Sequence, residues 1–325
     1  MSSAMLEVKG LNVSFQTGDG AVHAVRDLSL TVAPGEIVGL VGESGSGKSV
    51  TMMSVVRLLD RRRTEIRAEK MVVDGRSLLE LGRRDLESVR GPIVSYIFQD
   101  PLTALNPLLT VGRQITEGMR RHKGMSRSSA RARAIDLLRR VGIPAPETRI
   151  DQLPHQMSGG MRQRVMIAIA LAADPKLLIA DEPTTALDVT VQAEIVKLVQ
   201  SIQRERGMAM VWVTHDLALL AKLADRVVVM YAGRIVEDAT AEQLYAQPSH
   251  PYAAGLLAST SRIDDPFTEQ DPIPGTPPNP KIVSPGCSFA PRCSRAQPRC
   301  EAELPELHIT DDGRRVACFN PIMRT

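Results

Sequence analysis

The chain has 325 residues, of which 43% are hydrophobic, and its formal net charge at pH 7 is +3. This length suits one large domain with an appendage, and the nearly balanced charge gives no reason to expect a nucleic-acid partner. Neither a secretory signal nor an apolar run near the roughly 18 residues of a membrane span is evident, so we expect a cytosolic protein.

The alternation of apolar and polar residues predicts an α/β fold. Residues 5–40 alternate around turn residues, which indicates a small antiparallel sheet. Residues 71–75 and 93–98 read as further strands, and the stretch from 101 to about 160 turns helical and arginine-rich, as in an inserted helical subdomain. From there to residue 231, strands and helices alternate. Such alternation is typical of a parallel sheet covered by helices.

A glycine-rich loop follows the apolar run 37–41 and precedes the helix-like segment 49–59. Residues 42–49, GESGSGKS, fit the phosphate-binding pattern G-x-x-x-x-G-K-[ST] at every fixed position. Glycines let backbone N–H groups curl around phosphate oxygens, and the start of the helix adds attraction for anions. An accidental glycine-rich turn would fit in roughly one chain in a hundred at average glycine usage. We therefore expect a nucleoside triphosphate site formed by Gly42, Ser44, Gly45, Ser46, Gly47, Lys48, Ser49 and Val50.

Two acids end a later apolar strand and complete the predicted chemistry. Asp181 and Glu182 follow the run 177–180, at the carboxyl edge of the expected sheet, where ligands bind in open α/β folds. Lys48 is suited to neutralise the β- and γ-phosphates, while Ser49 and Asp181 are suited to hold Mg²⁺. Glu182 is suited to polarise the attacking water as a general base.

Further motifs resemble ABC-type ATPases over about residues 5–245. Residues 157–164, MSGGMRQR, look like the signature sequence of that family and lie just upstream of the acidic pair. The other matches are Phe15 for the aromatic residue that stacks on adenine, Gln99 for the Q-loop, Ala186-Leu187-Asp188 for the D-loop and His215 for the switch histidine. An alternative for Phe15 is a purely structural core residue.

The resemblance assigns roles to these residues. Ser158, Gly159 and Gly160 would contact the γ-phosphate of a nucleotide bound to a second subunit, so that two subunits enclose ATP between them. His215 would donate to the γ-phosphate, and Gln99 would join the shell of Mg²⁺ and water. Asp188 would belong to the same nucleotide site.

One branch of the family fits best, the ATPases of oligopeptide and dipeptide permeases. The signature departs from its commonest form at Met161, and this variant resembles that branch. So do two further segments, Pro154-His155-Gln156 before the signature and residues 248–252, PSHPY, after it. The resemblance implies uptake of di- or oligopeptides at the cytoplasmic face of the inner membrane. Its partners would be two transmembrane permease subunits, a second, related ATPase subunit and an extracytoplasmic solute-binding protein. Nickel or another small solute is an alternative cargo, and a non-transport ABC ATPase is disfavoured because only one P-loop is present.

The last part of the chain differs in character, so we expect an ATPase domain over 1–247 and an extension over 248–325. Residues 266–298 hold nine prolines, as in an extended arm, and all four cysteines fall here in the spacing C-x(5)-C-x(6)-C-x(17)-C. Cysteines gathered in a cytosolic chain favour metal over disulfides. We expect Cys287, Cys293, Cys300 and Cys318 to hold a [4Fe–4S] cluster, with Zn²⁺ or unmetallated thiols as alternatives.

Overall fold

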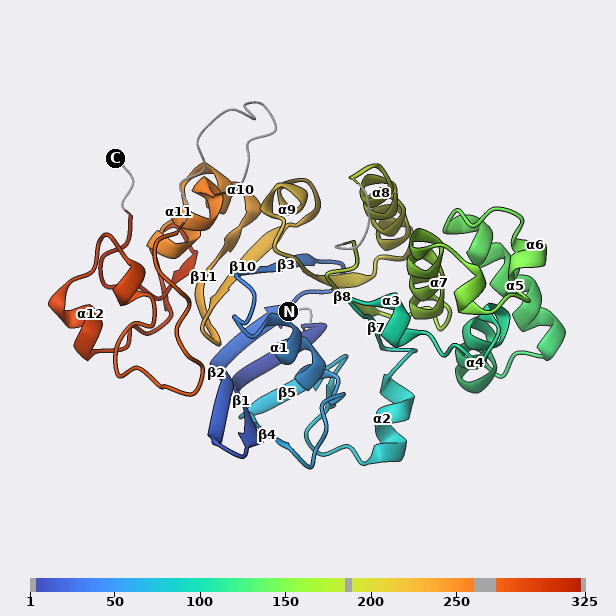
Figure 1. Cartoon of the computed structure of the whole chain (residues 1–325), viewed down its shortest axis with the longest axis horizontal. Helices are drawn as coiled ribbons and strands as arrows, with labels where there is room; N and C mark the ends of the chain where they lie inside the picture. The colour runs from blue at the N-terminus through green and yellow to red at the C-terminus, as the bar shows by residue number, and fades with distance from the viewer. Residues whose placement is uncertain (1–3, 185–188, 260–272, 323–325) are drawn as a thin grey trace. The chain divides into compact units, whose positions relative to one another are not determined.

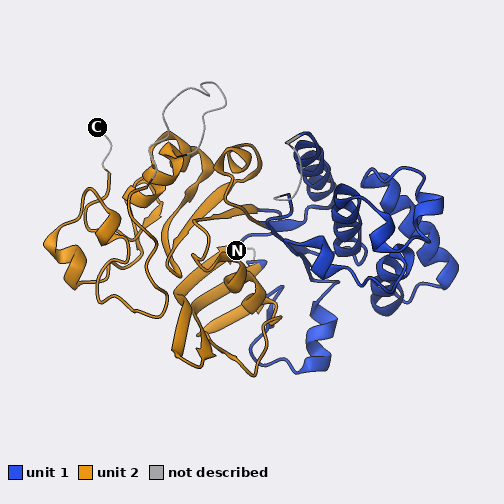
Figure 2. Ribbon diagram, in the orientation of Figure 1, with its two compact units in different colours: residues 1–5, 32–36, 73–211 blue, residues 6–31, 37–72, 212–325 orange. Residues whose placement is uncertain are grey.

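The computed structural model describes residues 4–184, 189–259 and 273–322. The chain divides into two compact units, coloured separately in Figure 2. Unit 1 comprises residues 1–5, 32–36 and 73–211, and unit 2 comprises 6–31, 37–72 and 212–325, within the limits of the described residues. No helix in the described part of the chain is both long enough and apolar enough to cross a bilayer.

Unit 1 contains parallel strands and a helical region. Strands β7 (Val94–Ile97) and β8 (Leu177–Asp181) pair in parallel, with Val94 opposite Leu177 and Ile97 opposite Ala180. All five residues of β8 are buried, as expected for a strand covered on both faces. The strand β9 (Ala209–Val213), most of which belongs to this unit, lies next to β8.

The apolar helix α7 (Gly159–Leu171) of unit 1 packs against α4 (Val111–Lys123), α5 (Arg127–Arg140) and β7 (Figure 1). Side-chain caps start α4 and α5: Thr110 accepts from the Arg113 N–H and Ser126 from the Ser129 N–H. The other elements of this unit are β6 (Arg76–Ser77), α2 (Arg83–Val89), α3 (Pro101–Ala104), α6 (Pro146–Arg149), a 3₁₀ turn (Pro154–Gln156) and α8 (Val189–Arg206).

Unit 2 begins with an antiparallel sheet, as the N-terminal alternation predicts. Strand β1 (Leu6–Thr17) lies between β2 (Gly20–Val32) and β5 (Lys70–Val73), and β4 (Thr64–Arg67) also pairs with β1. The buried positions of β1 and β2 include Leu6, Val8, Leu28 and Leu30, so one face of the sheet forms a core.

A second sheet in unit 2 carries the glycine-rich loop. Its strand order is β12 (His308–Ile309), β13 (Arg315–Val316), β11 (Arg234–Thr240), β10 (Arg226–Tyr231) and β3 (Ile37–Val41). Strand β10 is parallel to β3 and antiparallel to β11. The helices of this unit are α1 (Lys48–Val55), α9 (Leu217–Leu223), α10 (Ala241–Ala246), α11 (Pro251–Ala258) and α12 (Pro298–Ala302), with a 3₁₀ turn at Ala290–Arg292.

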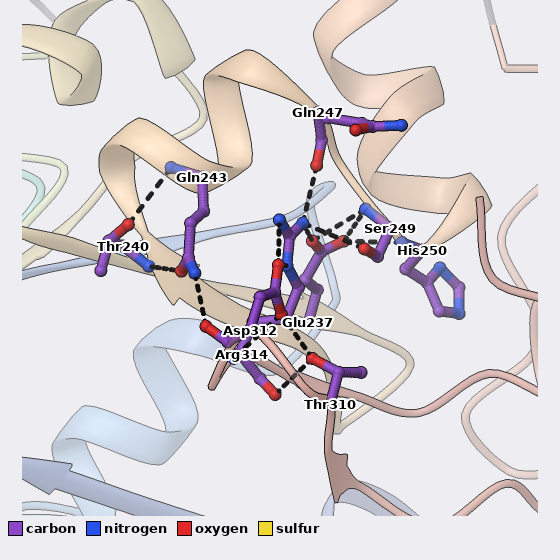
Figure 3. A network of polar contacts seen from close by, with 9 residues as sticks. All are labelled: Glu237, Thr240, Gln243, Gln247, Ser249, His250, Thr310, Asp312 and Arg314. Atoms are coloured by element: carbon purple, nitrogen blue, oxygen red, sulfur yellow. Dashed lines mark hydrogen bonds and ion pairs between the residues drawn. The ribbon is translucent and has the colours of Figure 1, made fainter. Parts of the chain in front are cut away.

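A buried ion pair ties the end of the chain to this sheet (Figure 3). Glu237 of β11 is fully buried and accepts the backbone N–H groups of Ser249 and His250, the latter over 2.7 Å. The Arg314 guanidinium lies 3.4 Å from Glu237, also donates to Ser249 Oγ, and forms an ion pair with Asp312. The extension is therefore a packed part of unit 2 rather than only an extended arm.

Candidate nucleotide-binding site

The glycine-rich loop follows β3 in a path that only glycine allows at two positions. Gly42 has φ +151° and Gly47 has φ +100°. A Cβ atom at Gly42 would lie 2.2 Å from the Met230 carbonyl oxygen, and one at Gly47 would lie 2.4 Å from the Ala24 carbonyl oxygen. The loop therefore runs directly against the backbones of β10 and β2, and a larger residue at either position would force it out.

The polar groups of this loop suit an anion. Lys48 is only 6% exposed, and its Nζ donates to the carbonyl oxygens of Gly42 (2.7 Å) and Glu43 (3.0 Å). The Ser46 hydroxyl is buried and has no hydrogen-bond partner in the described part of the chain. A phosphate oxygen would supply an acceptor for both groups, so the residues present fit a nucleotide's phosphates. Among the other predicted contacts, Ser44 and Gly45 are exposed, whereas Ser49 and Val50 are half-buried in the first turn of α1.

Two other predicted residues lie in unit 2. The N–H of Thr214 donates to the Leu40 carbonyl over 3.2 Å, so His215 follows β9 beside the point where the glycine-rich loop leaves β3. His215 is exposed, and Asp216 after it caps α9 by accepting the Leu219 N–H. Phe15 is half-buried in β1, where it pairs with Thr64 of β4.

The two acids of unit 1 lie where β8 ends. Asp181 is only 4% exposed, and its Oδ2 accepts the Tyr96 hydroxyl over 2.7 Å from the neighbouring strand β7. Burial, together with the negative charge of Asp181, raises the pKa of Tyr96 far above its ordinary value. The hydroxyl is therefore a permanent donor that orients the carboxylate.

Glu182 accepts a hydrogen bond from Gln99, the residue predicted to act with it. Its Oε2 accepts the Gln99 amide over 3.1 Å, because parallel pairing of β7 and β8 brings the segments that follow them together. Glu182 has φ +45°, in the left-handed region that non-glycine residues rarely adopt. Such strain is concentrated at functional sites. The buried Gln163 amide also donates to the Pro183 carbonyl, which fixes the next residue of this segment.

The predicted signature residues start α7. The Ser158 hydroxyl accepts the Met161 N–H over 3.3 Å, and the helix runs for 13 residues from Gly159. Ser158 and Gly159 are exposed and Gly160 is half-buried, and the space around the Cα of Gly159 is open. The start of α7 is thus accessible from outside the chain, as contact with a second subunit would require. Asp188, predicted for the same site, lies outside the described residues.

The prediction of a [4Fe–4S] cluster is wrong, and so is the alternative of a zinc site. All four cysteines are described, and they line one small cavity, yet no group of three or more His, Cys, Asp or Glu side chains in the described ranges is arranged to hold a metal ion. Burial raises the pKa of the Cys287 and Cys293 thiols and raises that of Cys318 to about 11. Metal ligation needs thiolates, which these environments disfavour.

Sequence reasoning missed two groups that fix the site residues. The first is Tyr96, the one tyrosine among the four residues of β7. Its strand was expected to lie in the same sheet as 177–180, which could have indicated that its hydroxyl reaches Asp181. Glu43 forms a bidentate ion pair with Arg292, which is 249 residues later in the chain. No short-range pattern indicates that contact.

Each unit by itself carries groups that suit a part of phosphoryl transfer. Unit 2 provides a loop for the phosphates, and unit 1 provides a buried carboxylate with a second carboxylate and an amide beside it. A buried carboxylate and a hydroxyl at the helix start are hard oxygen ligands of the kind that Mg²⁺ prefers. A carboxylate held by an amide can orient and polarise water.

Known proteins are similar in sequence to this chain over most of its length. Residues 25–185 match the family described as ABC transporter, and residues 236–300 match the one described as oligopeptide/dipeptide transporter, C-terminal region. An ATP-binding protein of Brucella abortus (strain 2308) is 49% identical over 98% of this chain and 95% of its own length. The dipeptide transport ATP-binding protein of Escherichia coli (strain K12) is 46% identical over 98% of this chain and 97% of its own length.

Solved structures confirm the fold. The dimeric structure of an ATP-binding cassette in a post-hydrolysis state, bound to ADP and Pi, superposes with a TM-score of 0.65 and 28% identity, covering 73% of this chain and 99% of that one. The predicted fold class, an ABC-type α/β ATPase with an antiparallel sheet and helical insertion, is therefore correct. The ATPase activity of this chain depends on ATP and Mg²⁺, as in the family. The chain belongs to the ATP-hydrolysing subunits of ABC transporters, in their oligopeptide/dipeptide branch.

Proposed function

We propose that this chain hydrolyses ATP to drive the import of di- or oligopeptides through a membrane transporter. The observation that supports peptides as the cargo is the match of residues 236–300 to the oligopeptide/dipeptide transporter C-terminal region. In addition, relatives named as dipeptide transport ATP-binding proteins are similar to this chain over nearly their full length. The chain would act at the cytoplasmic face of the inner membrane.

Each site residue has a specific role in this proposal. Lys48 and the N–H groups of residues 42–49 bind the phosphates of ATP, with Phe15 against the adenine. Ser49, Gln99 and Asp181 would hold Mg²⁺, which neutralises phosphate charge when bound. Glu182 takes the proton of the attacking water, and Gln99 keeps the carboxylate turned toward it. His215 donates to the γ-phosphate.

The partners follow from what this chain lacks by itself. The exposed start of α7, with Ser158, Gly159 and Gly160, binds the γ-phosphate of a nucleotide held by a second ATPase subunit of related sequence. Two membrane permease subunits change conformation in response to closure of the two ATPase subunits around ATP. An extracytoplasmic solute-binding protein delivers the peptide.

Reconstitution tests the cargo directly. The chain is assembled in proteoliposomes with the proposed permease subunits and second ATPase subunit. ATP turnover is then measured with the binding protein loaded with dipeptide, with nickel or with nothing. We expect dipeptide alone to stimulate turnover and to accumulate on the trans side. Stimulation by nickel and not by dipeptide would contradict the proposal, and the Glu182→Gln variant serves as the transport-dead control.

A further inference from the structure

One residue of the glycine-rich loop is held by the C-terminal extension at both its side chain and its backbone. The Arg292 guanidinium donates to Glu43 through Nη1 to Oε2 at 2.7 Å and through Nη2 to Oε1 at 2.9 Å. The Glu43 N–H donates to the Tyr252 hydroxyl oxygen over 2.8 Å. We propose that Arg292 and Tyr252 are positioning residues for ATP, which fix Glu43 and through it the phosphate-binding conformation of the loop.

Arg292 is itself held rigidly, which suits it to position another residue. Its side chain is 5% exposed, and besides Glu43 it donates to the carbonyl oxygens of Pro274 (2.8 Å) and Ile273 (3.3 Å) and to the Tyr231 hydroxyl (3.3 Å). These five contacts match the five N–H groups of a guanidinium. A bidentate pair of this kind has a defined geometry that a lysine cannot reproduce.

An aromatic cluster supports both positioning residues. The rings of Tyr231 and Tyr252 lie 4.5 Å apart between centroids, and the Phe289 ring lies 5.2 Å and 5.3 Å from them. The Arg292 guanidinium lies 5.8 Å from the centre of the Tyr231 ring. All three rings are buried, so neither the arginine nor the Tyr252 hydroxyl can shift without repacking the cluster.

Glu43 is well placed to transmit this restraint. Its carbonyl oxygen accepts the Lys48 ammonium over 3.0 Å and the Ser46 N–H over 3.2 Å, so the peptide group of Glu43 lies among the groups that would face phosphate. Holding its side chain and N–H from outside fixes how that peptide is turned. Arg292 also neutralises a carboxylate within a loop that must bind an anion, because an unpaired negative charge there would repel ATP.

The inference concerns the ATP step itself and does not depend on the transported solute. It predicts different effects for the two partners of the ion pair. Arg292→Gln leaves the Glu43 carboxylate unpaired, so the KM for ATP rises about tenfold, equivalent to about 1.4 kcal/mol, while kcat stays within about twofold. Glu43→Gln raises KM less, because the charge left behind is the positive one of Arg292, which does not repel ATP. The double variant recovers most of the affinity lost in Arg292→Gln.

The experiment measures KM and kcat for ATP in the assembled transporter, with thermal unfolding of each variant. Arg299→Gln is the matched control: it also removes a guanidinium that lies over an aromatic ring, that of Phe319, but Arg299 pairs with the exposed Glu303. Tyr252→Phe, which keeps the ring, should raise KM about threefold. The proposal fails if Arg292→Gln leaves KM unchanged, if Arg299→Gln raises it equally, or if the double variant is worse than Arg292→Gln. Should Arg292→Gln not fold, Arg292→Lys and Tyr252→Phe decide the matter by the same split between KM and kcat.

Discussion

The Tyr96 hydroxyl donates to Oδ2 of Asp181 over 2.7 Å, and this contact joins two neighbouring parallel strands at the proposed Mg²⁺ site. Tyr96→Phe removes the hydroxyl and keeps the ring, so the carboxylate loses one of the groups that orient it. Groups of this kind around a metal ligand are commonly worth 10- to 100-fold in metal affinity, and for this neutral donor we expect about tenfold. ATP turnover measured against Mg²⁺ concentration should shift accordingly.

Tyr245→Phe is the control for that experiment, because the Tyr245 hydroxyl donates to the Leu217 carbonyl in unit 2 and contacts no proposed Mg²⁺ ligand. Its Mg²⁺ dependence should equal that of the unaltered protein. An unshifted Mg²⁺ curve in Tyr96→Phe would show that this hydroxyl does not orient Asp181 for the metal.

Replacement of Glu182 by Gln tests the proposed general base. The amide is nearly isosteric and can still contact Gln99, but it cannot take a proton from water. Turnover should fall by about 10²- to 10⁴-fold, while ATP binding remains and the two ATPase subunits stay associated around the nucleotide. Single-turnover assays and sedimentation in the presence of ATP measure the two effects. Undiminished turnover would remove Glu182 from the role of base.

His250 makes the stability of unit 2 depend on pH. Burial lowers the pKa of His250 to about 3, and its Nδ1 accepts the Tyr252 N–H over 3.0 Å. The unfolded chain takes up a proton near pH 6.5 and the folded chain does not, so stability falls as pH drops from about 6.5 toward 3. At pH 5 the loss relative to pH 7.5 should be about 2 kcal/mol in the free energy of unfolding.

His250→Asn isolates this contribution. Asparagine can also cap α11 but does not titrate, so the loss of stability between pH 7.5 and 5 should shrink by about 2 kcal/mol, measured by urea unfolding. Burial raises the pKa of the neighbouring Glu237, which acts in the opposite direction, but Glu237 is present in both proteins and cancels in the comparison. Equal pH dependence of the two proteins would contradict the assignment.

Arg314→Met tests the buried pair drawn in Figure 3. It leaves the fully buried Glu237 carboxylate without its guanidinium, and removal of one partner of a buried pair typically costs about 3 to 5 kcal/mol. Urea unfolding should show a loss near the lower end, since backbone N–H groups still bind Glu237. The double variant with Glu237→Gln, which keeps an oxygen to accept those N–H groups, should recover part of it. No recovery would mean that the loss is one of packing alone.

Much of the fold could be predicted because its signals are local. The apolar stretches 37–41 and 177–180 indicate buried strands, and the structure has β3 and β8 there. The loop between β3 and α1 has glycines wherever the backbone runs against a neighbour. Gln99 and Glu182 could be expected to meet because each follows a strand of one parallel sheet.

The rest depends on contacts between distant segments. The proline content of 266–298 suggested an extended arm, but within this segment Phe289 and Arg292 are buried, and Arg292 pairs with Glu43 of the glycine-rich loop. Cysteine spacing alone does not fix how thiols are arranged, so the metal prediction failed where the side-chain geometry decided.

The ion pair between Glu43 and Arg292 also has a consequence for synthesis of the protein. At about 5 to 20 residues per second, the ribosome makes Arg292 tens of seconds after Glu43, since the two are 249 residues apart. During that interval a nascent chain exposes the glycine-rich loop without its anchor, and β11 still lacks its partner β13. The β11 edge of the second sheet of unit 2 therefore stays unpaired by β13 until the last residues of the chain are made.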